Sequence, residues 1–146
     1  MNTIRFYKPT DPYGEFSNFS HHSVKIDDKL WPTNEHYFQA QKFRGTHHEE
    51  EIRLLASPME AKIAGQDRNR PLRKDWEQVK DDVMRTAIKA KFTQYDDLKQ
   101  LLKSTQTSFL IEHTYNDSYW ADGGNGRGRN MLGQILMEVR QQLESV

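Results

Sequence analysis

The most regular pattern of hydrophobic and polar positions lies between residues 75 and 92. Apolar side chains recur there every three or four residues, as on one face of an α-helix. The apolar positions are Trp76, Val79, Val83, Met84, Ala87, Ile88 and Phe92. This pattern predicts a long amphipathic helix with one buried face.

Start and stop signals predict shorter helices elsewhere. Ser57 is a suitable N-cap, Pro58 stands at the first helical position, and Glu60 completes a capping box. Thr33 can cap a helix that ends before Gly45, a residue typical of helix C-termini. The predicted helices cover residues 34–44, 49–55, 58–65, 75–92, 95–103 and 131–143.

Short segments at 4–7, 23–26, 29–31 and 109–113 favour strands, and the Asp27-Asp28 pair predicts a hairpin turn. A chain of 146 residues fits one compact domain. We therefore expect an α+β fold, in which residues 1–146 form a single helix-rich domain with a small antiparallel sheet.

Composition restricts the classes of function. The chain balances 21 Lys and Arg against 21 Asp and Glu, which argues against a dedicated nucleic-acid or membrane-surface protein. The absence of cysteine excludes disulfides, thiolate zinc sites and cysteine nucleophiles. The N-terminus lacks the layout of a secretory signal, and no apolar run reaches the roughly 18 residues of a membrane helix. We expect a cytoplasmic protein without a membrane partner.

The first predicted helix places reactive side chains on one face. Glu35, Phe38, Gln39 and Lys42 follow one another at helical spacing. A carboxylate and an amine beside an aromatic ring can act as acid and base, or as a nucleophile with its electrostatic partner. Alternatively, Glu35 only offsets the helix dipole and Lys42 is solvated. Spacing alone leaves both interpretations open.

A glycine-rich segment between residues 119 and 130 forms a second candidate. Its glycines allow a ligand to approach the backbone, and Arg127 and Arg129 can bind phosphate. Asn130 can cap the helix that follows, and a helix N-terminus favours anions. The segment predicts a phosphate-bearing ligand; a surface loop with a helix cap is the alternative.

Other candidates are weaker. Asp122 beside Trp120 can bind ribose hydroxyls, or it forms an ordinary turn. Asn18 can contact a base edge or a ribose while Phe19 stacks, or the loop only fills the core. Composition favours a position in the hydrophobic core for Trp76.

The histidines show no metal-binding spacing. His47 and His48 precede Glu49 in a polar stretch, and the zinc pattern His-Glu-x-x-His does not occur. We expect neither a metal nor another cofactor.

The segment Trp-Pro-Thr-Asn-Glu-His-Tyr-Phe-Gln-Ala-Gln-Lys-Phe at residues 31–43 is specific enough to identify a resemblance. Further matching positions are Phe-Ser-Asn-Phe at 16–19, Trp76, Lys80, Val83-Met84, Ala87, Lys91-Phe92, Trp-Ala-Asp-Gly at 120–123, Gly-Arg-Asn-Met-Leu-Gly at 128–133 and Leu136-Met137. Over nearly its whole length the chain resembles the YbiA-like family, also called NADAR.

The resemblance implies N-glycosidase chemistry, which breaks a ribose C1–N bond. Bacterial YbiA-like members act on early phosphoribosylamino-pyrimidine intermediates of riboflavin synthesis, whereas other members remove ADP-ribose from guanine in nucleic acid. Net neutrality favours the small metabolite, so nucleic acid is expected only as a modified substrate. A non-catalytic module that binds ADP-ribose or another nucleotide is the rival interpretation, and the oligomeric state stays open.

The resemblance also assigns site residues. It maps catalytic roles to Glu35, Lys42 and Asp122, and it links Trp76 and Trp120 to the site. One departure concerns residues 65–68, Gly-Gln-Asp-Arg, where many members carry Gly-Arg. A phosphate contact there falls to Arg68 or Arg70, or is absent.

Overall fold

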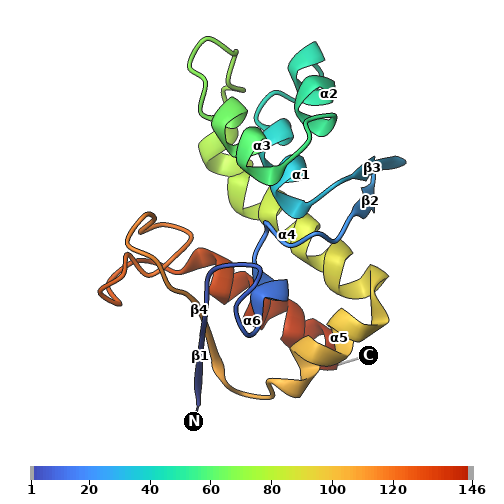
Figure 1. The fold of residues 1–146 in the computed structure, drawn as a ribbon. Coiled ribbons are helices and arrows are strands. Elements are labelled where there is room, and N and C mark those ends of the chain that lie inside the picture. The colour runs from blue at the N-terminus through green and yellow to red at the C-terminus, as the bar shows by residue number, and fades with distance from the viewer. Residues whose placement is uncertain (1, 145–146) are drawn as a thin grey trace. The chain divides into compact units, whose positions relative to one another are not determined.

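The computed structural model describes residues 2–144 (Figure 1). Its elements in chain order are β1 Thr3–Phe6, the 3-10 helix η1 Gly14–Phe16, β2 Val24–Ile26, β3 Lys29–Trp31, α1 Asn34–Gln41, α2 His47–Arg53, α3 Pro58–Gly65, α4 Trp76–Gln94, α5 Asp96–Ser104, β4 Phe109–Glu112 and α6 Met131–Glu144. The predicted α+β fold, rich in helix and poor in strand, is confirmed.

Two helix boundaries differ from the predictions for local reasons. α1 ends at Gln41 because the next backbone N–H groups bond three residues back, from Phe43 to Ala40 for example, which tightens the chain toward Gly45. α2 begins earlier than predicted because Thr46 is its N-cap and accepts a hydrogen bond from the His48 N–H.

The strands form two separate pairs. β2 and β3 make the predicted antiparallel hairpin, in which Asp27 and Asp28 have φ of 55° and 64°. Positive φ at both central residues is the signature of a type I′ turn. β1 and β4 instead pair in parallel, with Thr3 opposite Phe109. The sheet content is thus small, as predicted, but only the hairpin is antiparallel.

The chain divides into two compact units. We call His21–Lys91 the central unit, and the chain up to Ser20 together with the chain from Phe92 onward the terminal unit. The boundary between them falls within α4. That residues 1–146 form one domain stays a prediction.

The central unit surrounds α1. Helices α1, α2 and α3 lie side by side in Figure 1, and α1 contacts both of the others. All eight residues of α1 are buried, although several are polar. His36 shows how such side chains are satisfied, since Nδ1 lies 2.8 Å from Thr33 Oγ1 and Nε2 lies 3.0 Å from the Leu55 carbonyl oxygen. The apolar core of this unit comprises Val24, Ile26, Trp31, Tyr37, Ala40, Phe43, Ile52, Ala61 and Ala87.

The terminal unit packs α6 against β4 and α5. Phe16 is 1% exposed and its ring contacts Phe6 and Phe92. A Cβ at Gly133 would lie 2.0 Å from the Leu110 carbonyl oxygen, so glycine permits the close approach of α6 to β4. Among the helices described, none has the length and apolar character needed to span a bilayer.

Candidate active site

The predicted site residues fall into both units. Glu35, Lys42 and Trp76 belong to the central unit. The terminal unit contains Asn18, Phe19, Trp120, Asp122, Arg127, Arg129 and Asn130.

Glu35 lies in the first turn of α1 and is 7% exposed. Gln39, one helical turn further on, donates a hydrogen bond from Nε2 to Glu35 Oε2 at 2.8 Å. Gln39 is 5% exposed, and its Oε1 accepts no hydrogen bond from any residue in the described part of the chain. A carboxylate held in this way inside the protein keeps one orientation. This is a property expected of a reactive group rather than of a simple helix-dipole residue.

Gly65, the last residue of α3, supports the same group of side chains. A Cβ at this position would lie 1.9 Å from Gln39 Oε1, so only glycine leaves room for the Gln39 side chain. The Gly65 carbonyl oxygen also accepts a hydrogen bond from Lys42 Nζ at 3.2 Å. The end of α3 therefore contacts the side chains of both Gln39 and Lys42.

Lys42 follows the last residue of α1 and keeps helical dihedral angles, so the predicted common face with Glu35 is retained. Its Nζ lies 5.9 Å from the ring centroids of both Phe38 and Trp76, and these two rings meet edge to face. Burial lowers the pKa of the Lys42 ammonium below its ordinary value of 10.5, although Glu35 and Glu77 act in the opposite direction. More of the amine is therefore neutral, and nucleophilic, than for a solvated lysine.

Trp76 opens α4 and is 6% exposed. It is a buried residue, as composition indicates, and its ring also lies near the Lys42 amine. Sequence reasoning listed Gln39 only for its spacing and did not identify Gly65 as a support. The helix-start signal at Pro58 predicted α3, but no local sequence pattern indicates which helix α3 contacts.

In the terminal unit, Asp122 is 4% exposed and both of its carboxylate oxygens are engaged. Oδ2 lies 2.7 Å from His113 Nδ1, and Oδ1 accepts hydrogen bonds from the N–H groups of Thr114 and Gly124. Burial alone would raise the pKa of this carboxyl, but the hydrogen bonds from His113 and Gly124 outweigh it and lower the pKa below 3.8. Asp122 is an ionised carboxylate that organises its own loop. His113 was not singled out from the sequence.

The glycine-rich loop differs from the predicted phosphate cradle. Gly123 and Gly124 have φ of 73° and 81°, as the sequence suggested for a tight loop. However, the N–H groups of residues 123, 124 and 127–130 all donate to acceptors in residues 117–125. The first N–H groups of α6 are likewise bonded, from Met131 to the Tyr119 carbonyl and from Leu132 to the Trp120 carbonyl. These two N–H groups at the helix N-terminus thus have acceptors within the chain, and anion binding at this terminus stays a prediction.

The arginine side chains of this loop remain available. Arg127 and Arg129 are exposed, and the Arg129 guanidinium lies 4.8 Å from the Tyr119 ring centroid. Tyr119 in turn meets the half-buried Trp120 edge to face. The exposed side chains of Arg127 and Arg129 are therefore candidates for a phosphate contact.

Asn130 also differs from its predicted use. Its Oδ1 accepts from the Glu112 N–H and its Nδ2 donates to the Leu110 carbonyl, so its amide binds β4 instead of capping α6. Both polar atoms of the Asn130 side chain thus have partners within the chain, which argues against a substrate contact by this residue. In the loop after η1, Asn18 is buried and Phe19 is half-buried.

Arg68 and Arg70 differ in their availability for the phosphate contact considered at residues 65–68. Arg70 Nη1 donates to Glu51 Oε1 at 2.6 Å and to His48 Nδ1 at 2.8 Å. Arg70 is thus committed to α2, and of the two arginines considered only Arg68 is exposed.

Comparison with known proteins places these observations in a family. The NADAR domain family model matches residues 5–144, which include both units. The chain is 56% identical to N-glycosidase YbiA of Escherichia coli over 96% of this chain and 88% of that protein. An N-glycosidase of Nostoc punctiforme is 44% identical, with 99% of this chain and 94% of that protein covered.

A longer relative and a solved structure agree with this placement. The riboflavin biosynthesis protein PYRR, chloroplastic, of Zea mays is 43% identical over 97% of this chain and 25% of its own length. The solution structure of E. coli YbiA matches with a TM-score of 0.92 at 54% identity, and covers 99% of this chain and 86% of that one. With matches of this extent, the chain belongs to the NADAR family and is an enzyme of the N-glycosidase class.

Proposed function

We propose that this N-glycosidase hydrolyses the ribose C1–N bond of phosphoribosylamino-pyrimidine intermediates of riboflavin biosynthesis. The observation that carries the proposal is the buried Glu35 carboxylate, oriented by Gln39, on the same helix face as an amine of lowered pKa. The similarity to the riboflavin biosynthesis protein of Zea mays supports this substrate class. The balance of 21 basic and 21 acidic side chains fits a small metabolite better than a nucleic-acid polymer.

Glu35 is proposed to act on the sugar. Cleavage of a glycosidic bond passes through an oxocarbenium-like transition state, in which positive charge develops at C1. A carboxylate held in one orientation stabilises that charge or orients the attacking water. The hydrogen bond from Gln39 supports this role because it restricts rotation of the carboxylate.

Lys42 has two alternative roles. As an ammonium, it positions the Glu35 carboxylate or the substrate phosphate. As a neutral amine, it adds to C1 of the ring-opened sugar, where an imine bond joins C1 to the base nitrogen. Protonation and departure of the base amine then break the C1–N bond and leave a Schiff base between Lys42 and C1, which water hydrolyses to the sugar phosphate and the free lysine. The lowered pKa favours the second role because it increases the neutral fraction. Borohydride reduction during turnover, followed by mass spectrometry, distinguishes the two: an adduct at Lys42 supports the covalent role, and its absence excludes it.

In the terminal unit, we assign substrate contacts to exposed or half-buried side chains. Arg127 and Arg129 bind phosphate, and Trp120 contacts the base or sugar. Asp122 contributes by fixing the loop that carries these residues, because its carboxylate binds the Gly124 N–H and the His113 ring.

The test compares release of free base from a phosphoribosylamino-pyrimidine, an ADP-ribosyl-guanine oligonucleotide and ordinary nucleosides. The proposal expects the first substrate to give the highest kcat/KM. Glu35→Gln is expected to lose at least about 100-fold, the scale of acid/base groups, without unfolding. Faster turnover of ADP-ribosyl-guanine would replace the proposed substrate with the alternative. Tight binding without base release in calorimetry would instead favour a non-catalytic binding module.

A further inference from the structure

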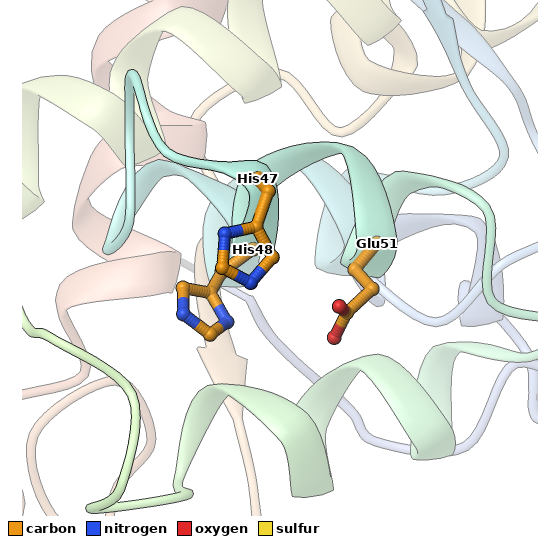
Figure 2. A group of neighbouring side chains, drawn as sticks. All are labelled: His47, His48 and Glu51. Carbon is orange, nitrogen blue, oxygen red and sulfur yellow. The ribbon is translucent and has the colours of Figure 1, made fainter.

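Three side chains with metal-binding atoms gather on α2, apart from the residues of the proposed reaction. Figure 2 shows His47, His48 and Glu51 extending from the same side of the helix. One ring nitrogen of each histidine and one carboxylate oxygen of Glu51 all lie within 4.8 Å of one another. The sequence drew attention to Glu49 as the neighbour of the histidines, but the helix turn brings Glu51 to them instead.

Two imidazoles and one carboxylate form a ligand set suited to a borderline divalent cation such as Zn²⁺, Ni²⁺ or Cu²⁺. Ligand atoms around tetrahedral zinc lie about 3.4 Å apart, given bond lengths near 2.0–2.1 Å. The separations here are at most 4.8 Å, and because both His47 and Glu51 are exposed, rotation of their side chains can adjust them to a metal ion. Water can complete the coordination.

A cation already lies among these groups. The Arg70 guanidinium donates from Nη1 to His48 Nδ1 at 2.8 Å and to Glu51 Oε1 at 2.6 Å. His48 Nδ1 therefore presents its lone pair, since it accepts this hydrogen bond. One guanidinium nitrogen thus holds His48 Nδ1 and Glu51 Oε1 beside each other.

Arg70 holds these atoms with interactions that are weak enough to be replaced. The Glu51 side chain is 52% exposed, and ion pairs open to solvent contribute little to stability. Arg70 has a second partner outside the cluster, Asp67, whose Oδ2 lies 3.5 Å from Arg70 Nε. A displaced guanidinium thus keeps a carboxylate nearby and is not left without a partner.

We propose that His47, His48 and Glu51 form a binding site for a divalent transition-metal ion, in which the metal replaces the Arg70 guanidinium. The site is additional to the glycosidase chemistry and supplies none of its groups. Metal and Arg70 compete for the same two side chains, His48 and Glu51. Binding of the ion therefore releases the segment that carries Arg70 from α2.

The test is a titration of the full chain with Zn²⁺ against a fluorescent chelator at neutral pH. His48→Ala and Glu51→Gln should each weaken binding more than about tenfold, since even the loss of an outer partner of a metal ligand commonly costs 10- to 100-fold. Arg70→Ala should tighten binding by about three- to tenfold, because it removes the competing ion pair. This gain is the decisive result, since metal bound at histidines remote from Arg70 would not respond to the substitution.

His21 and His22 provide the matched control, as a second adjacent histidine pair in the central unit. His21→Ala/His22→Ala should bind Zn²⁺ as the wild type does, and thermal unfolding should show that every variant is folded. Equal loss in the control would overturn the proposal, as would Zn²⁺ binding that is unchanged by His48→Ala. Weaker or unchanged affinity in Arg70→Ala would overturn it as well.

Discussion

Replacement of Gly65 by alanine tests the support of Glu35 without altering the carboxylate. A Cβ at residue 65 would lie 1.9 Å from Oε1, 2.6 Å from Cδ and 3.0 Å from Cβ of Gln39. Three such short distances along one side chain cannot be relieved by its tip alone, so Gln39 must leave its position. We expect the 2.8 Å hydrogen bond from Gln39 to Glu35 to break.

The size of the effect follows from that hydrogen bond. A hydrogen bond to a charged group contributes about 1.5–3 kcal/mol, and about 1.4 kcal/mol corresponds to a tenfold change in rate. If the bond holds the carboxylate in its reactive orientation, Gly65→Ala lowers kcat/KM by roughly 10- to 150-fold. Gln39→Ala should lower it to a similar extent, because it removes the same bond.

A double-mutant cycle of base release provides the assay. In the Gln39→Ala background, Gly65→Ala should cost little more, since the side chain that the new Cβ meets is gone. Ile63→Ala is the control on α3, because Ile63 is 63% exposed and should not affect the rate. Losses that multiply in the double variant would refute the reasoning, as would a Gly65→Ala enzyme with wild-type kcat/KM.

Three further predictions concern buried titratable groups. Burial disfavours the charged form of Lys42 and lowers its pKa, so Lys42→Met should raise the melting temperature of the protein. The same substitution should slow base release at least about 100-fold. A less stable variant, or a fully active one, would contradict this. Burial lowers the pKa of His36 below 6.5, so below that pH the unfolded chain binds a proton that the folded chain does not, and stability falls. Denaturant unfolding between about pH 7.5 and 5 should therefore show a shallower pH dependence for His36→Gln than for the wild type. The folded state lowers the pKa of Asp122 below 3.8, so the ionised carboxylate stabilises the fold above that pH. This contribution to stability is lost as the pH falls through the pKa of Asp122 in the folded protein. Asp122→Asn should abolish this pH dependence and speed hydrogen exchange at the Gly124 amide.

The local features of the fold and site were accessible from the sequence. Helical spacing placed Glu35 and Lys42 on one face, and this face persists although α1 ends at Gln41. The Asp27-Asp28 turn and the Ser57 cap were predicted because each depends only on neighbouring residues. Burial of the α1 face was not predictable from spacing, which is why the solvated alternative had to remain open.

Contacts between distant segments were not accessible. The approach of Gly65 to Gln39 joins two helices, and nothing in either segment specifies the other. Asn130 looked like a helix cap, but its amide binds β4, whose position depends on the fold as a whole. The glycine loop looked like a phosphate cradle because a sequence does not show which N–H groups already have acceptors.

The parallel pairing of β1 with β4 has a consequence for how the chain folds as it leaves the ribosome. Thr3 has its partner at Phe109, so the first strand emerges long before the segment that completes its ladder. The central unit, by contrast, is one continuous stretch of chain, His21–Lys91, and all of it has been synthesised before that partner appears. Synthesis therefore allows the stretch that carries Glu35 and Lys42 to fold first, while closure of β1 onto β4 is delayed and bears the larger loop-closure entropy.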